Sequence, residues 1–117
     1  MKNTKTLVLA AACSLATAAT GAETVSPEQI QAKAATCAAC HGADGNASAS
    51  AQYPRLAGQY HDYLARALHE YKSGERKNPI MGGFAGTLSD AEIDGLSRYF
   101  GALPGKLDDL SKYEQGD

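Results

Sequence analysis

The feature that most restricts this chain is one pentapeptide, Cys37-Ala38-Ala39-Cys40-His41. It lies at the end of a predicted helix, where residues three apart face the same side. Two thiols on one side suit addition across the two vinyl groups of a haem, and the adjacent imidazole then falls beneath the iron. We interpret the pentapeptide as an attachment site for one covalent haem, which fixes both the ring and the metal.

Three other uses of these two cysteines fit the chain less well. A Cys-x-x-Cys dithiol oxidoreductase places its motif in a βαβ unit, and this chain lacks the period-two alternation that predicts strands. A structural zinc site needs four ligands, whereas Cys37, Cys40 and His41 supply three. A disulfide between the two cysteines would leave the histidine without a role.

Residues 1–22 have the features of an export signal. Lys2 and Lys5 precede an apolar run over residues 7–19, and small residues that suit a signal peptidase follow it. The run of about 13 residues is too short for a membrane span, which needs roughly 20. We therefore expect cleavage after residue 22, a periplasmic domain over residues 23–117, and no integral membrane span in the mature chain.

Removal of this segment changes the charge and the cysteine content. The whole chain has 11 basic and 13 acidic side chains, so loss of Lys2 and Lys5 changes the formal net charge from −2 to −4. Cys13 is interpreted as an apolar residue of the signal, and the alternative is a lipid-anchor site. The acidic balance argues against nucleic acid as a partner and favours redox partner proteins with basic docking patches.

The periodicity of the mature segment is helical. Three stretches carry an apolar stripe at helical spacing and a start or stop signal: residues 26–42, 58–73 and 89–101. The first and third begin with capping boxes, and the second is followed by Gly74. Residues 75–87 contain a proline and three glycines, which predicts a loop. We expect an all-α domain of three main helices and loops wrapped around the haem.

A core made of three short helices is small. A domain of this length removes only about 60% of its unfolded-chain surface from water, and such domains often need a metal, a disulfide or another staple. The small core therefore favours an apolar cofactor independently of the pentapeptide.

A six-coordinate haem iron needs a second axial ligand. Met81 is the only methionine after signal removal, and it lies in the predicted loop 40 residues beyond His41. Methionines are usually core residues, but an irregular loop can deliver this one across the ring. His61 and His69 lie at the flank and on the outer side of the second predicted helix. Met81 is therefore the preferred ligand, ahead of these histidines and of oxygen or lysine donors.

These motifs together resemble a known family, the class I cytochromes c. The resemblance is to the small bacterial kind, found singly and as each half of the two-haem cytochromes of the c-four group. The resemblance runs over residues 31–117, and the matching segments are residues 32–35, 37–46, 54–59, 81 and 88–93.

The resemblance implies seven residues around the haem: Cys37, Cys40, His41, Tyr53, Pro54, Leu56 and Met81. The two cysteines carry thioether bonds, and His41 and Met81 bind the iron from opposite sides. The carbonyl of Pro54 accepts a hydrogen bond from the His41 ring, which fixes the imidazole. Tyr53 and Leu56 line the haem.

The function that follows is one-electron transfer by a periplasmic carrier in a respiratory chain. With both axial positions filled no substrate can bind at iron, so the chain is not expected to be an enzyme itself. The alternative is a haem subunit of a periplasmic dehydrogenase complex.

One position departs from the family pattern. Relatives commonly have a glycine about two turns before the first haem cysteine, where the N- and C-terminal helices cross closely. This chain has Ile30 there. The sequence leaves two explanations open, a wider crossing or a shifted register.

Overall fold

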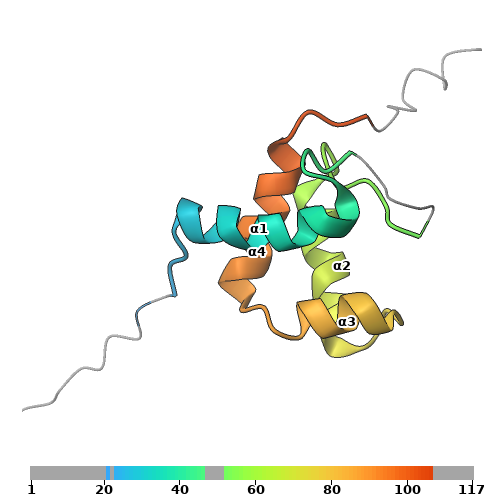
Figure 1. Ribbon diagram of the computed structural model, residues 1–117. Helices are drawn as coiled ribbons and strands as arrows, with labels where there is room; N and C mark the ends of the chain where they lie inside the picture. The colour runs from blue at the N-terminus through green and yellow to red at the C-terminus, as the bar shows by residue number, and fades with distance from the viewer. Residues whose placement is uncertain (1–20, 22, 47–51, 107–117) are drawn as a thin grey trace, which may run out of the picture.

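All regular structure described in the computed structural model is helical. The description covers residues 21, 23–46 and 52–106. It contains four helices in the order α1 (Pro27–His41), α2 (His61–Ser73), α3 (Pro79–Ala85) and α4 (Asp90–Ala102) (Figure 1). The all-α prediction is confirmed. No helix in this part of the chain is long and apolar enough to cross a membrane. The predicted signal peptide, apart from residue 21, lies outside the described residues, as does Cys13.

The predicted helix boundaries are confirmed at the starts of α1 and α4 and at the end of α2, where capping residues fix them. In α1 the Ser26 hydroxyl accepts from the backbone N–H of Gln29 at 3.3 Å, and the Gln29 side chain accepts from the Ser26 N–H at 2.8 Å. The start of α4 has the same reciprocal pair. Gly74 ends α2 with a φ of +83°, a left-handed conformation that glycine adopts without strain. However, α2 begins at His61 and not at the predicted residue 58, and Tyr60 precedes the helix and is exposed.

The prediction of a loop over residues 75–87 is wrong, because this segment contains α3. The Asn78 side chain accepts hydrogen bonds from the backbone N–H groups of Ile80 at 3.0 Å and Met81 at 3.1 Å. Pro79 occupies the first helical position, where its missing N–H costs nothing. Local capping therefore outweighs the low helix propensity of the glycines, and Met81 lies on a short helix.

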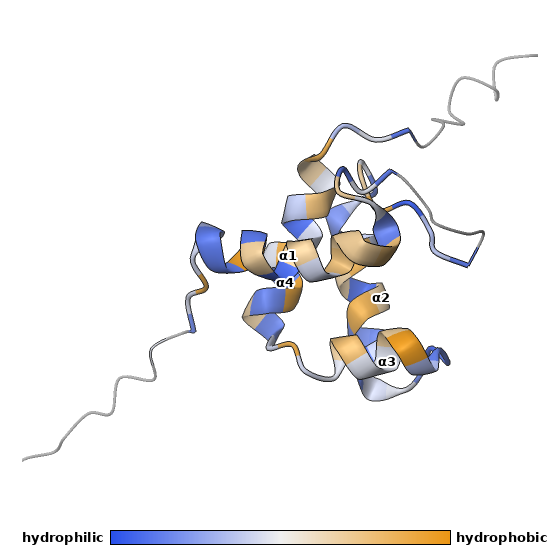
Figure 2. Cartoon of the chain, in the orientation of Figure 1, coloured by the Kyte–Doolittle hydropathy of each residue, from blue (hydrophilic) through white to orange (hydrophobic). Residues whose placement is uncertain are grey.

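The helices pack around a small core. The chain crosses itself where α1 runs in front of α4, and α2 packs against both α4 and α3 (Figure 1). The buried cluster draws residues from α1, α2 and α4: Ile30, Ala34, Leu64, Leu96 and Phe100. Figure 2 shows hydrophobic residues on α3 as well, yet only Ala85 of this helix is buried. The apolar side of α3 is therefore not covered by the described residues.

The crossing of α1 and α4 explains why Ile30 is tolerated. A Cβ atom built on Gly95 of α4 would lie 2.4 Å from Cδ1 of Ile30 and 2.8 Å from its Cγ1. The small residue at the crossing is therefore on α4, and the large one is on α1. The small residue that allows this close approach is thus Gly95 of α4, opposite Ile30.

We expect Gly95→Ala to destabilise the protein by about 1–3 kcal/mol, as overpacked cores usually do. In an unobstructed helix the same change would stabilise the protein by about 1 kcal/mol. A decrease in the free energy of unfolding therefore identifies the clash with Ile30. Chemical denaturation of the haem-loaded protein measures the effect. The double variant Ile30→Ala/Gly95→Ala should lose less than the sum of the two single variants. Strict additivity would contradict the proposed contact.

Candidate functional site

One cavity brings together all seven residues that the sequence predicts around the cofactor. It has a volume of about 890 Å³ and lies between the helices and the segment that joins α1 to α2. Its lining includes Cys37, Cys40 and His41 from α1, Tyr53, Pro54 and Leu56 from the connecting segment, and Met81 from α3. The seven predicted residues, of which Cys37 and Met81 are 44 positions apart in sequence, thus line the same cavity.

The size of the cavity indicates that an apolar group belongs in it. Ligand pockets span roughly 300–1,000 Å³, and a volume of about 890 Å³ lies in the upper part of that range. The lining is mainly apolar and includes Leu64, Leu68 and Phe100. A large planar apolar ring fits such a lining, and the nitrogen and sulfur donors on the walls suit an iron at its centre.

His41 is held in one tautomer at the wall of this cavity. Its side chain is buried, and Nδ1 lies 2.7 Å from the carbonyl oxygen of Pro54. A carbonyl oxygen can only accept, so Nδ1 carries the hydrogen and donates it. Nε2 is then the unprotonated nitrogen, which is the form of imidazole that binds a metal. The Tyr53 ring meets the His41 ring edge-on, with centroids 6.4 Å apart.

Two hydrogen bonds hold the segment that carries Pro54 in place. The backbone N–H of Leu56 donates to the carbonyl of Gly45 at 2.8 Å, which closes the loop on itself. The Asn46 side chain donates to the carbonyl of Pro104 at 2.8 Å and thereby ties the loop to the segment after α4. These bonds hold the Pro54 carbonyl where it meets the imidazole.

Cys37 and Cys40 line the same cavity and form no disulfide with each other. Burial raises the pKa of the Cys37 thiol above its ordinary value, and its S–H points toward the Lys33 carbonyl at 3.7 Å. A dithiol oxidoreductase needs a thiolate with a lowered pKa, so this environment disfavours redox exchange. Within residues 21, 23–46 and 52–106, no cluster of three or more His, Cys, Asp or Glu could hold a metal ion. The zinc alternative therefore has no support in the described part.

The histidines outside the pentapeptide lie away from the cavity. Met81 is partly buried and lines it, whereas His61 and His69 are exposed and are absent from its walls. Nδ1 of His69 lies 4.0 Å from an Asp90 carboxylate oxygen on the outer surface. Among the methionine and histidine candidates for a second ligand, only Met81 therefore has access to the same space as His41.

Several walls of the cavity were not predicted from the sequence. They come from α2, α3, α4 and the two segments that join these helices: Tyr63, Tyr71, Arg76, Ile80, Phe84, Leu88 and Ser97. The Ser97 hydroxyl is buried and has no hydrogen-bond partner in the described part of the chain. A serine between Leu96 and Phe100 on an otherwise apolar helix face was the available sequence signal for that residue.

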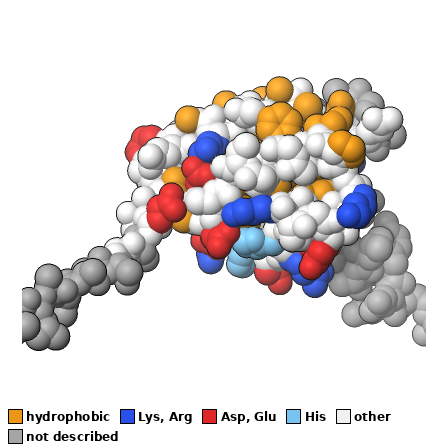
Figure 3. Space-filling view, turned by 90° about the horizontal axis from the view of Figure 1, so that it is seen from below, with side chains coloured by type: hydrophobic (Ala, Val, Ile, Leu, Met, Phe, Trp, Pro, Cys, Tyr) orange, Lys and Arg blue, Asp and Glu red, His pale blue; other side chains and the backbone are white. Residues whose placement is uncertain are grey.

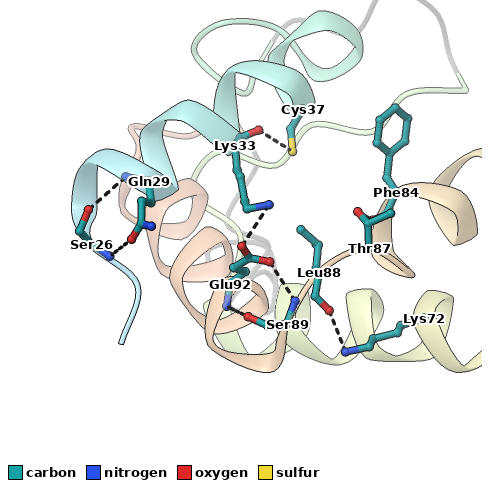
Figure 4. A network of polar contacts seen from close by, with 10 residues as sticks. All are labelled: Ser26, Gln29, Lys33, Cys37, Lys72, Phe84, Thr87, Leu88, Ser89 and Glu92. Atoms are coloured by element: carbon teal, nitrogen blue, oxygen red, sulfur yellow. Dashed lines mark hydrogen bonds and ion pairs between the residues drawn. The ribbon is translucent and has the colours of Figure 1, made fainter. Parts of the chain in front are cut away.

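Two lysines hold the junction between α3 and α4 (Figure 4). Lys72 Nζ lies 2.8 Å from the Leu88 carbonyl oxygen and donates to it, and Lys33 Nζ lies 3.0 Å from a carboxylate oxygen of Glu92. The backbone N–H of Ser89, followed by Lys33, holds the pKa of Glu92 below its ordinary value. The carboxylate is thus charged at neutral pH, and the junction places Leu88 in the cavity wall.

The charges on one face of the molecule are mixed. Figure 3 shows acidic and basic side chains interspersed across this face, with hydrophobic side chains gathered along one edge. On α2 and at the start of α4 the opposite charges pair, as in the contact of 3.1 Å between Lys72 and Asp90. This face therefore carries no extended patch of one sign.

This chain is similar in sequence to known proteins. The family model described as Cytochrome c matches residues 28–103. Cytochrome c4 of Pseudomonas aeruginosa is 47% identical over 70 residues, which cover 60% of this chain and 34% of that protein. A thiosulfate dehydrogenase electron acceptor of Thiomonas intermedia is 45% identical over 71 residues, which cover 61% of this chain and 33% of that protein.

A solved structure is similar in fold as well as in sequence. The reduced recombinant cytochrome c4 from Pseudomonas stutzeri matches with a TM-score of 0.55 and 36% identity, over 58% of this chain and 38% of that one. The chain thus spans about a third of the length of the curated relatives named above.

Proposed function

This chain belongs to the cytochrome c family, with haem c as its cofactor, and on that premise we propose that it is a periplasmic one-electron carrier whose iron is bound by His41 and Met81. The observation that carries the proposal is the convergence of the pentapeptide and Met81 on one apolar cavity. Residues 1–22 serve as the export signal, so that the carrier acts after their removal.

The residues of the cavity have separate tasks. Cys37 and Cys40 hold the ring through thioether bonds, and His41 presents Nε2 to the iron. The hydrogen bond of 2.7 Å to the Pro54 carbonyl keeps the imidazole oriented and makes it a stronger donor. Met81 supplies a thioether from the opposite side, a ligand that favours reduced iron and raises the reduction potential. Haem iron ligated in this way gains and loses a single electron.

The ligand set disfavours catalysis at the iron. With the His41 imidazole and the Met81 thioether both bound to it, the iron would have no coordination position open for a substrate. The apolar walls keep water away from the iron, which also stabilises the less charged reduced state. The chain is therefore an electron-transfer protein in this proposal, whether it acts alone or within an oxidoreductase complex.

Docking to redox partners follows from the charge. The mature chain, with nine basic and 13 acidic side chains, has a formal charge of −4. Basic patches on the partner would attract it, and association rates would fall as salt screens this attraction. Redox encounters generally bury less than about 1,200 Å² in total, which suits rapid dissociation after transfer.

A second candidate role is that of a haem subunit bound to a dehydrogenase. The observation that favours it is the similarity to a protein named as the electron acceptor of thiosulfate dehydrogenase. We prefer the freely diffusing carrier, because no long apolar docking segment is found among the described residues.

Purification from the native host separates the two roles. A freely diffusing carrier should elute at the size of a single small domain in gel filtration, and its redox titration should follow a one-electron Nernst slope of about 59 mV per decade. Co-elution with a dehydrogenase in a stable large complex would contradict the carrier and support the subunit. A protein that cannot be reduced and reoxidised reversibly would contradict both.

A further inference from the structure

The connection between α2 and α3 controls where Met81 lies. It consists of residues 74–78, and Met81 is the third residue of α3. Only Ala85 of this short helix is buried, whereas Ile80 and Phe84 are about half exposed. Because α3 has only seven residues, contacts in the connection help to fix the end that carries Met81.

Arg76 fastens this connection to α2. Its backbone N–H donates to the Glu70 carbonyl at 3.1 Å, and its Nε donates to a Glu70 carboxylate oxygen at 3.0 Å. The guanidinium carbon lies 5.3 Å from the ring centroid of Tyr71 and 5.8 Å from that of Tyr63, within the range of cation–π contact. All three partners belong to α2, so the backbone and the side chain of Arg76 are attached to the same helix.

The chemistry of this attachment is specific to arginine. The Tyr63 side chain, followed by that of Tyr71, raises the pKa of Arg76, so the group is a cation at every pH at which the protein folds. A planar guanidinium can stack on two rings while its N–H groups reach a carboxylate. A lysine at this position would keep the charge and lose the planar stacking.

Only a short stretch of backbone separates Arg76 from the residue that caps α3. Asn78, two residues after Arg76, accepts a hydrogen bond from the Met81 backbone N–H at 3.1 Å. Arg76 and Met81 also line the same cavity. At the far end of α3, the bond from Lys72 to the Leu88 carbonyl holds the chain independently.

We propose that Arg76 is a positioning residue for Met81. Arg76 clamps the connection 74–78 onto α2 and thereby keeps the Met81 thioether directed at the iron. This inference rests on the proposed ligation by Met81. It predicts that loss of the clamp increases the fraction of molecules in which the Met81–iron bond is open, while His41 stays bound.

Imidazole binding to the oxidised, haem-loaded protein measures that fraction. An added ligand reaches the iron only when Met81 is displaced, so its apparent affinity rises in proportion to the open population. We expect Arg76→Ala to bind imidazole about tenfold more tightly than wild type, and Arg76→Lys about threefold more tightly. The far-red charge-transfer band of the methionine–ferric iron bond should weaken in parallel.

Arg66 provides a matched control. Its Nε lies 3.8 Å from a Glu70 carboxylate oxygen, and its guanidinium carbon lies 5.8 Å from the Tyr63 ring centroid. It belongs to α2 itself and does not line the cavity. Arg66→Ala should therefore leave the imidazole affinity within about twofold of wild type.

The outcomes separate this inference from the ligand assignment. If Met81→Ala opens the iron while Arg76→Ala binds imidazole as wild type does, Arg76 has no positioning role, even if its variant melts earlier. If Met81→Ala also leaves the band and the affinity unchanged, the ligand assignment itself is wrong. Should Arg76→Ala fail to fold, Arg76→Lys decides: tighter imidazole binding supports the clamp, and wild-type affinity overturns it.

Discussion

The double variant Cys37→Ala/Cys40→Ala is expected to yield almost no folded protein. The apolar cavity of about 890 Å³ is bounded by residues from all four helices, so the covalent haem forms much of the core. Without it the helices share only a small buried cluster, and domains near this size are marginal without a staple. Circular dichroism and thermal melting of the exported chain measure the loss of helix content and of a cooperative transition.

The single variants serve as controls. Cys37→Ala and Cys40→Ala each retain one attachment point and His41, so they should give reduced yields of coloured, folded protein. A double variant that melts cooperatively with native helix content and no pigment would show that the polypeptide forms its own core. The role assigned to the cavity would then be wrong.

Replacing Met81 with alanine is expected to lower the reduction potential on the order of 0.1 V, within the roughly 0.8 V range over which axial ligands set haem potentials. The loss of the thioether removes the ligand that favours reduced iron. It also leaves an open position, so the reduced variant should bind carbon monoxide without denaturant. Spectroelectrochemistry and carbon monoxide difference spectra measure the two effects.

Ile80→Ala is the matched control for this change. Ile80 precedes Met81 on α3, lines the same cavity and is 51% exposed. Its removal should shift the potential much less than the loss of Met81 does, and it should leave the iron site closed to carbon monoxide. An unaltered spectrum and potential in Met81→Ala would show that another residue binds the iron.

The parts of the fold that could be predicted are those set by local chemistry. Ser26 and Ser89 each form a reciprocal capping box, so the starts of α1 and α4 follow from four residues in each case. The start of α2 has no side-chain hydrogen bond at its N-cap, Tyr60, and was predicted too early. The helix α3 was missed because its glycines lower helix propensity, although Asn78-Pro79 carried the signal for a helix start.

The residues of the candidate site also differ in how far the sequence could predict them. The pentapeptide and its spacing predict the residues nearest the iron, because their chemistry depends on positions three or four apart. The role of Gly95 could not be predicted, since the clash it avoids is with Ile30, 65 residues earlier in the chain. Arg76 was missed for a similar reason, because its importance comes from two tyrosines that only the folded α2 brings beside it.

Covalent attachment of one haem is the central claim, and intact-protein mass spectrometry combined with an alkaline pyridine spectrum tests it most directly. The periplasmic protein should have the mass of the mature chain plus one haem, and the pigment should stay with the polypeptide on denaturation and show the spectrum of two thioether bonds. A correctly processed chain that is colourless and free of iron, or that releases its pigment on denaturation, would contradict the account.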